Sequence, residues 1–155
     1  EILADRVDRV LGLDTSRGLL GEARSRVGEV TLLQGDAARL PVTDDRVDLA
    51  LYIATLHHLP DRETRRESLA ELARVLAPGG VGLVSAWSTA HERFGDRTEG
   101  FDTTVDWTLP GGETVPRFYH IYAPAEFDAD LDRSGLRALD SFVSSGNCYA
   151  VVAPE

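Results

Sequence analysis

The stretch Asp48-Leu-Ala-Leu-Tyr-Ile-Ala-Thr-Leu-His-His58 decides the fold of this chain. Its apolar first half has the length and composition of a strand buried on both faces of a parallel sheet. A helical pattern opens at Asp61, Pro78-Gly79-Gly80 is expected to end it, and a second apolar run extends from Val81 to Trp87. A strand, a loop, a crossover helix and a further strand are therefore predicted, which is the repeating unit of a doubly wound α/β sheet.

The same alternation precedes this stretch. Short apolar runs at Val10–Leu13 and Val30–Leu33 have the length of buried strands, and the helical pattern between them can be capped by Thr15 or Ser16. Residues 1–6 have the pattern of a helix already in progress. Two more strands on the same parallel sheet are therefore predicted.

The last third of the chain contains an insert and a hairpin. Residues 88–122 are polar and contain glycine, and the segment is too long to be only a connecting loop in a compact domain. We therefore expect it to form a substrate region. A helix is predicted over residues 124–133. The strands predicted at 136–143 and 147–153 are joined by Ser144-Ser-Gly146, and so short a link requires an antiparallel pair. The whole chain is predicted to be one domain, a mostly parallel sheet with a C-terminal antiparallel hairpin.

Length and composition limit the class of protein. With 155 residues and 43% apolar composition, the chain can build one core. No apolar run approaches the roughly 20 residues of a bilayer span and no signal peptide opens the chain, so we expect a cytoplasmic protein without a membrane partner. Cys148 is the single cysteine and is expected to be a buried side chain. No metal site is assigned.

The charge balance is strongly acidic. There are 26 acidic residues against 16 basic ones, every basic residue is arginine, and the acids are spread over the whole chain. This composition is typical of proteins from extreme halophiles. A net charge of −10 opposes nucleic-acid binding at low salt. Molar salt screens charges beyond about 3 Å, so the acidic total weakens a nucleic-acid hypothesis without removing it.

Two aspartates stand directly after predicted strands. Asp14 is placed to accept hydrogen bonds from both ribose hydroxyls of a nucleoside cofactor, although alone it could equally be a helix cap. Asp36 is placed to accept from an adenine amino group, and the backbone N–H of Ala37 to reach a ring nitrogen. Thr15 and Ser16 would lie against the adenine edge. The repeated arrangement favours a nucleoside-binding site.

Further candidate site residues lie at the end of the strand predicted in the first half of Asp48–His58. Tyr52 and Ile53 fall at its carboxyl end, where ligands of open parallel sheets collect, although Ile53 could simply be core. His57 and His58 open the following loop. One is expected to face the site and the other to be structural or solvated. A lone loop histidine is usually not catalytic, so His57 is taken as a site-lining candidate.

These residues together resemble the class I S-adenosylmethionine-dependent methyltransferases, in their later two thirds. Within that class the chain is similar to the tRNA wobble-uridine carboxymethyl methyltransferases. The similarity rests on Asp14-Thr-Ser16, Asp36-Ala37, Leu40-Pro41, His57-His58, Arg117-Phe-Tyr-His120, Glu126 and Gly146-Asn147. Two residues depart from the family pattern: Tyr52 replaces a small hydroxyl residue, and Cys148 replaces a tryptophan.

The resemblance implies S-adenosylmethionine as cofactor and the carboxylate of a carboxymethylated wobble uridine in tRNA as methyl acceptor. An ionised carboxylate can attack a sulfonium methyl directly, so it needs positioning more than a strong base. Arg117 could hold that carboxylate or a phosphate, with His120 or Tyr119 orienting it, but an ordinary surface ion pair for Arg117 is as compatible with the composition.

Arg62, Arg65 and Arg66 are interpreted as a salt-bridged, solvated helix face that could alternatively meet tRNA phosphate.

The resemblance also implies a partner and a missing part. A small zinc-binding activator protein is expected to cover the edge strand Val30–Leu33. The family's first, central strand and its Gly-rich turn have no counterpart before Asp14, so we expect an incomplete copy that binds the cofactor poorly. A small-molecule methyltransferase and a noncatalytic protein-binding subunit remain open alternatives.

Overall fold

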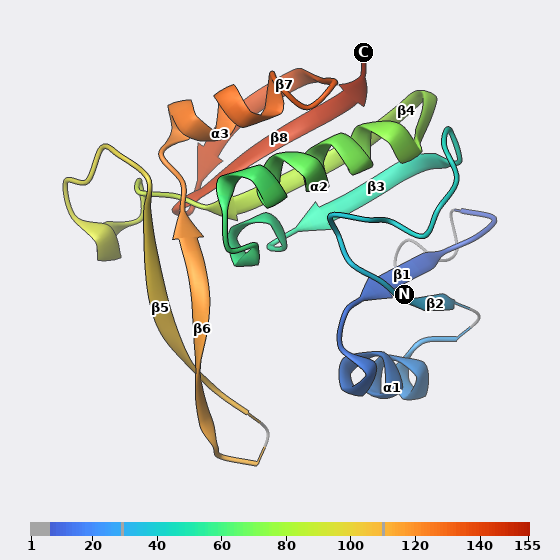
Figure 1. Cartoon of the computed structure of the whole chain (residues 1–155), viewed down its shortest axis with the longest axis horizontal. Helices are drawn as coiled ribbons and strands as arrows, with labels where there is room; N and C mark the ends of the chain where they lie inside the picture. Colours follow the sequence, from blue (N-terminus) through green and yellow to red (C-terminus); the bar gives the residue numbers. More distant parts are fainter. Residues whose placement is uncertain (1–6, 29, 110) are drawn as a thin grey trace. The chain divides into compact units, whose positions relative to one another are not determined.

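The chain divides into two units between Pro41 and Val42, and the computed structural model describes residues 7–28, 30–109 and 111–155. The helix expected at residues 1–6 lies outside the described residues. In the first unit, helix α1 (Arg17–Arg26) connects strand β1 (Leu11–Asp14) to strand β2 (Thr31–Gln34) (Figure 1). The two strands pair in parallel, as predicted, and each ends one residue later than expected.

The second unit is built on a four-stranded sheet. Its order is β3-β4-β8-β7, in which β3 and β4 are parallel and the other pairs are antiparallel. The α/β class and the C-terminal hairpin are confirmed. The bounds of the strands are Val47–Ile53 for β3, Leu76–Trp87 for β4, Leu136–Ser144 for β7 and Asn147–Pro154 for β8.

Local sequence explains how these elements begin and turn. Helix α2 (Arg62–Val75) starts where the Asp61 carboxylate accepts the Thr64 N–H at 2.8 Å. Helix α3 (Pro124–Leu131) opens with proline, whose missing N–H needs no partner in a first turn. The tight turn between β7 and β8 uses positive φ at Ser145 (48°) and Gly146 (74°), which suits the twist of a hairpin.

The end of α2 differs from the prediction. The helix stops at Val75, and Leu76 already begins strand β4, so Pro78-Gly79-Gly80 lies inside that strand and does not end the helix. The β3–β4 register shifts there, between Val47 and Leu49. A side chain at Gly80 would lie 2.7 Å from the Val47 carbonyl oxygen, so the glycine permits the close approach of the two backbones.

The predicted substrate insert contains regular structure that the sequence pattern did not indicate. A short 3-10 helix, η3 (Glu92–Phe94), is followed by an antiparallel hairpin of β5 (Phe101–Thr108) and β6 (Thr114–Ile121). Figure 1 shows this hairpin extending beyond the four-stranded sheet. Threonine, valine and aromatic residues occur in both strands, and these residues favour extended backbone even in a polar segment.

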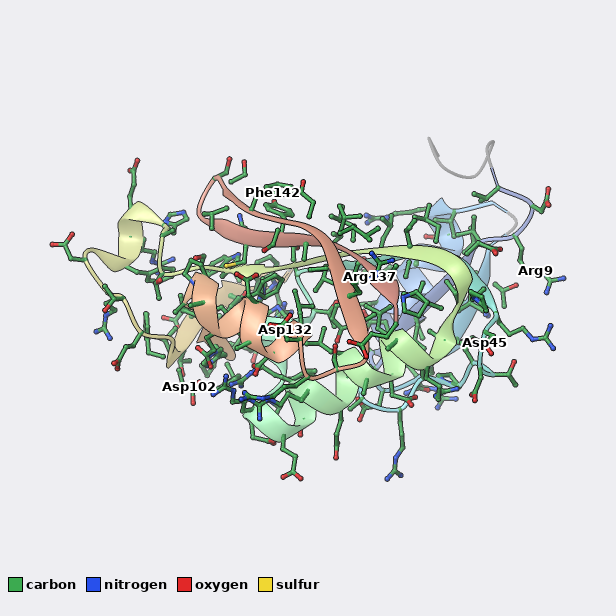
Figure 2. All side chains as sticks on the ribbon, turned by 90° about the horizontal axis from the view of Figure 1, so that it is seen from above. Arg9, Asp45, Asp102, Asp132, Arg137 and Phe142 are labelled. Carbon is green, nitrogen blue, oxygen red and sulfur yellow. The ribbon has the colours of Figure 1, made fainter. Side chains whose placement is uncertain are left out.

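Within the second unit, helices α2 and α3 pack against the same face of the sheet (Figure 2). Leu69 and Leu72 of α2 are fully or almost fully buried, whereas Leu49, Leu51 and Ile53 on the other face of β3 are 44%, 54% and 43% exposed. Figure 2 shows the two helices on one side of the sheet and Phe142 on the other. The expectation that Val47–Ile53 is buried on both faces is therefore wrong. No helix among the described residues is long and apolar enough to span a bilayer.

The core of the second unit should depend on Leu69. Its side chain is 0% exposed, so Leu69→Ala leaves a cavity and is expected to lower the free energy of unfolding by about 2–5 kcal/mol. Leu139→Ala is the matched control, since that side chain is 46% exposed and its loss should cost less than about 0.5 kcal/mol. Urea unfolding of both variants measures the difference. Equal losses in the two variants would contradict this description of the core.

Candidate functional site

Asp14 is the last residue of β1 and Asp36 follows β2, and because these strands are parallel the two aspartates lie at the same end of the β1–β2 pair. One carboxylate oxygen of Asp14 accepts the Ser16 N–H at 2.7 Å, and one of Asp36 accepts the Ala38 N–H at 2.9 Å. Among the described residues, the second oxygen of each carboxylate has no hydrogen-bond donor. Each aspartate therefore keeps an acceptor for a ligand while its own turn holds it in place.

The turns around these aspartates are closely packed. A side chain at Gly35 would lie 2.9 Å from Pro41 Cδ and 3.0 Å from Leu13 Cδ1, so only glycine fits between β2 and Asp36. The Gln34 side chain donates to the Thr15 carbonyl oxygen at 3.0 Å. The Ser16 hydroxyl accepts the Leu19 N–H at 3.3 Å as the cap of α1. Ala37 is buried beside Asp36.

Tyr52 and Ile53 point to opposite faces of β3. The Tyr52 side chain is buried, and its hydroxyl is hydrogen-bonded to the Ser68 hydroxyl of α2. Its phenol therefore faces the helix. Ile53 is 43% exposed and is not the core residue that the sequence allowed. Of this pair, Ile53 is the one with a side chain accessible to a ligand.

The histidine pair lies in the 3-10 helix η2 (Leu56–His58), directly after β3. His57 is 1% exposed, and its Nδ1 accepts the Trp87 N–H at 3.1 Å. Its ring stacks on Tyr119, with centroids 5.2 Å apart. Burial, and then the neighbouring His58, lower the pKa of His57 to about 3, so the ring is neutral near pH 7.

His58 is half-buried and contacts the other strand of the site. Its Nδ1 lies 3.2 Å from the Phe118 carbonyl oxygen, and its ring meets the edge of Tyr119 at a centroid distance of 4.4 Å. Burial lowers the pKa of His58 as well. The two histidines thus attach η2 to strands β4 and β6.

Within the described part of the chain, Arg117 does not form the surface ion pair that the composition allowed. Its guanidinium lies over the Trp107 ring, 4.6 Å from the centroid, on the β5–β6 hairpin. Trp107 is 46% exposed. A cation over an exposed aromatic ring is a pair that can also stack against a planar base.

His120 lies between two carboxylates. Its Nδ1 is 2.7 Å from an Asp102 oxygen, and its Nε2 is 3.2 Å from a Glu126 oxygen. A side chain at Gly100 would lie 1.9 Å from Glu126 Oε2, so glycine at this position makes room for the carboxylate. Both nitrogens of the ring are occupied, and His120 therefore has no free nitrogen with which to accept a proton from a substrate.

The arginines of α2 differ from the solvated face that was expected. Arg62 and Arg66 both form ion pairs with Asp130 of α3, which is 0% exposed, at 2.9 and 2.8 Å. Arg65 is only 3% exposed. The sequence did not single out Asp130, since one aspartate among fifteen gives no sign of burial. It did not single out Asp102 either, because the pairing of Asp102 with His120 across β5 and β6 becomes apparent only in the structure.

Cys148 is buried as predicted, and burial raises its pKa.

The low pKa of His57 predicts how stability depends on pH. In the unfolded chain His57 binds a proton at its ordinary pKa of 6.5, whereas in the folded chain its pKa is about 3. The neutral His57 therefore contributes fully to the free energy of unfolding above pH 6.5, and this contribution is lost as the pH falls toward 3. The full difference corresponds to about 5 kcal/mol, of which about 3 kcal/mol should be lost between pH 7 and pH 4.5. Urea unfolding of wild type and His57→Asn at both pH values measures it.

His91→Asn is the matched control, because His91, the N-cap residue of η3, is exposed. The His57→Asn variant should lose less stability on acidification than wild type, and His91→Asn should behave as wild type does. If all three proteins lose stability equally, His57 is not held neutral by the fold.

Comparison with known proteins identifies the family. Residues 1–84 match a family model described as a methyltransferase domain. A protein of Encephalitozoon cuniculi that is named as a methyltransferase is 32% identical over 148 residues, which cover 92% of this chain and 69% of that protein. The tRNA (carboxymethyluridine(34)-5-O)-methyltransferase of Saccharomyces cerevisiae is 31% identical over 114 residues, 70% of this chain. The chain spans only 40% of the length of that yeast enzyme.

Solved structures agree with this. A DhpI–SAM–HEP complex is 28% identical, with a TM-score of 0.74 over 99% of this chain and 72% of that one. The complex of the Haloferax volcanii Trm112 methyltransferase activator with a methyltransferase has a TM-score of 0.73 at 19% identity, over 99% of this chain and 76% of that one. The chain therefore belongs to the methyltransferase-domain family, with the class I fold whose cofactor is S-adenosylmethionine.

Proposed function

We propose that this chain is the methyltransferase part of an enzyme that esterifies the carboxylate of a carboxymethylated wobble uridine in tRNA. The observation that supports this most is the 31% identity over 70% of the chain with the yeast enzyme named for that reaction. The Arg117-Phe-Tyr-His120 segment lies in strand β6 beside η2, so both candidate substrate segments meet in one unit.

The first unit fits the adenosine half of the cofactor. Asp14 would hold the ribose hydroxyls and Asp36 the adenine amino group, each through the carboxylate oxygen that its own turn does not use. Ala37, Thr15 and Ser16 would lie along the adenine ring. When bound, S-adenosylmethionine supplies a methyl group on a positively charged sulfur.

The residues of the second unit would position the acceptor. A carboxylate is ionised near neutral pH and needs no base, so a neutral His57 and a doubly occupied His120 are compatible with the reaction. We assign positioning roles to both. His57 fixes Trp87 and Tyr119, and His120 fixes the start of β5 against α3. Tyr52 would act through α2, since its hydroxyl bonds Ser68.

The test uses a strain in which the gene for this protein is deleted. Mass spectrometry of its tRNA should show the free carboxymethyl-uridine in place of the methyl ester, and the wild-type gene should restore the ester. Asp14→Asn removes a charged acceptor worth about 1.5–3 kcal/mol, so this variant should bind the cofactor about 10–100-fold more weakly and restore little ester.

Asp132→Asn is the matched control, because Asp132 is exposed at the end of α3, and it should restore the ester fully. Normal ester levels in the deletion strain would contradict the tRNA substrate. If the ester persists while cofactor binding still depends on Asp14, the small-molecule alternative is the better assignment. If binding does not depend on Asp14, the noncatalytic alternative is favoured.

We further propose that strand β2 binds a small activator protein, for which we expect zinc binding. Within the described residues β2 pairs only with β1, so its other edge presents free backbone groups. The Thr31 N–H donates to the Val10 carbonyl at 3.1 Å, so the alternate Leu32 N–H points to the free edge. The similarity to a methyltransferase solved with its Trm112 activator supports the proposal.

Leu32→Pro removes that outward N–H, and Leu32→Ala removes the same side chain but keeps the N–H. Affinity-tagged protein isolated from its native host should carry a small zinc protein. The proline variant should lose it and the alanine variant should retain it. Purification of the wild-type protein alone would contradict the proposal.

A further inference from the structure

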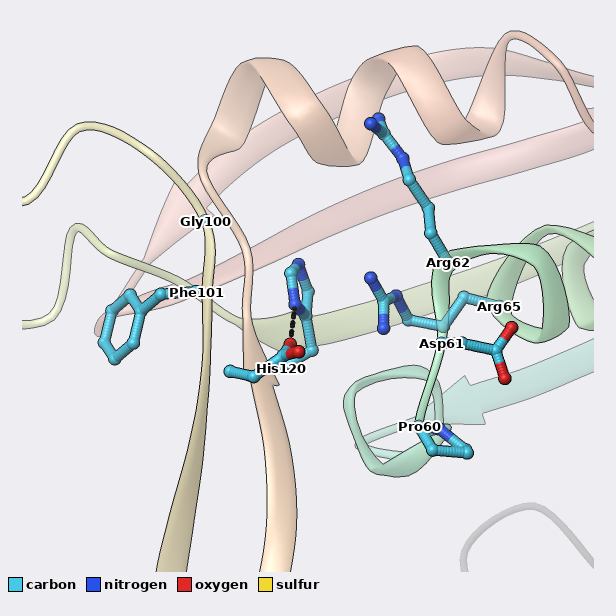
Figure 3. Close-up of a pocket in the computed structure, with 8 residues that line it drawn as sticks. Pro60, Asp61, Arg62, Arg65, Gly100, Phe101 and His120 are labelled. Carbon is cyan, nitrogen blue, oxygen red and sulfur yellow. Dashed lines mark hydrogen bonds and ion pairs between the residues drawn. The ribbon is translucent and has the colours of Figure 1, made fainter.

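A cavity of about 510 Å³ lies in the second unit, between the start of α2 and the base of the β5–β6 hairpin. Its walls come from Pro60–Arg62 and Arg65 on one side and from Gly100–Asp102 and His120 on the other. Figure 3 shows the Arg65 guanidinium directed toward His120. The cavity is large enough for a small anionic group together with part of the molecule that contains it.

Arg65 is the unusual group in this cavity. Its side chain is 3% exposed, and its Nη1 donates to the Leu59 carbonyl oxygen at 3.2 Å. Its Nε is buried without a hydrogen-bond acceptor, and no carboxylate of the described residues forms an ion pair with it. The guanidinium lies over the Tyr122 ring, 5.5 Å from the ring centroid. A buried cation without a neighbouring anion is unfavourable, so this site is electrostatically incomplete.

The neighbouring carboxylates are already engaged. Asp61 accepts the Thr64 N–H and hydroxyl, and Arg65 lowers its pKa only as a minor cause. Asp102 contacts His120, and Glu126 contacts both His120 and Arg62. Asp130 is shared by Arg62 and Arg66. Among the described residues, each of these acids thus has a partner, while Arg65 has no carboxylate as an ion-pair partner.

We propose that this cavity binds a small oxyanion, a carboxylate or a phosphate, through the guanidinium of Arg65. The planar fork of arginine matches two oxygens of either group. The N-terminus of α2, a helix of 14 residues, adds a favourable field for negative charge at the same wall. Arg62, 43% exposed at the rim, would steer the anion inward. The inference goes beyond the proposed methyl transfer, since it holds whichever acceptor the enzyme uses.

The experiment follows the arginine Nε–H resonances of the ¹⁵N-labelled protein by NMR during titration with inorganic phosphate or acetate at constant ionic strength. The Arg65 resonance, identified by its absence in Arg65→Lys, should shift saturably, with half-saturation on the order of 1 mM. Saturation by phosphate alone identifies a phosphate site, and saturation by acetate alone a carboxylate site. Saturation by both supports a general oxyanion site.

Arg65→Lys keeps the charge and the alkyl stem, so the variant is expected to fold, and it should lose the saturable response of the neighbouring His120 amide. Arg133→Lys is the matched control, since Arg133 is exposed in the segment after α3, and it should respond as wild type does. A linear response of Arg65 to both anions, or an equal response in Arg65→Lys, would overturn the proposal. Binding is read without any methyl transfer, so its failure leaves the proposed function untouched.

Discussion

Two parallel strands cannot be joined by a tight turn, and this constraint organises both units of the chain. Helix α1 makes the crossover from β1 to β2, and α2 makes the crossover from β3 to β4. Each crossover returns the chain to the same end of the sheet, so the carboxyl ends of paired strands coincide. This is why Asp14 and Asp36, 22 residues apart in sequence, lie at one edge, and why η2 opens beside the end of β4.

Ion pairs between neighbouring elements hold the second unit together, although the acidic composition gives no indication of them. In a chain with a net charge of −10, α2 carries a buried arginine, Arg65, a half-buried one, Arg66, and an exposed one, Arg62. Arg62 and Arg66 pair with the buried Asp130, which connects α2 to α3. The carboxylates of Asp102 and Glu126 hold His120 at the base of the hairpin. Because each of these contacts joins two elements, the same side chains that stabilise the packing also shape the cavity beside Arg65.

Hydrophobic periodicity and the residues of caps and turns were sufficient to predict much of the fold. The strand Val47–Ile53, the Asp61 cap and the Ser144-Ser-Gly146 turn follow from local rules and were predicted. The β5–β6 hairpin was missed because β6 (Thr-Val-Pro-Arg-Phe-Tyr-His-Ile) has no regular alternation of apolar and polar residues and contains a proline, so the segment did not show two matching strands. Burial of Arg65 and Asp130 could not be predicted, since it depends on how α2 and α3 pack and no local pattern encodes that contact. The same holds for the stacking of Arg117 on Trp107.

The paired strand ends of the first unit are proposed to hold the adenosine of the cofactor. NMR of the backbone amides during titration with S-adenosylmethionine to millimolar concentration can decide this. We expect saturable shifts at Asp14–Ser16 and Asp36–Ala38, with the β7–β8 hairpin unchanged as an internal reference. Saturable shifts that leave both aspartate turns unchanged would rule out this binding site.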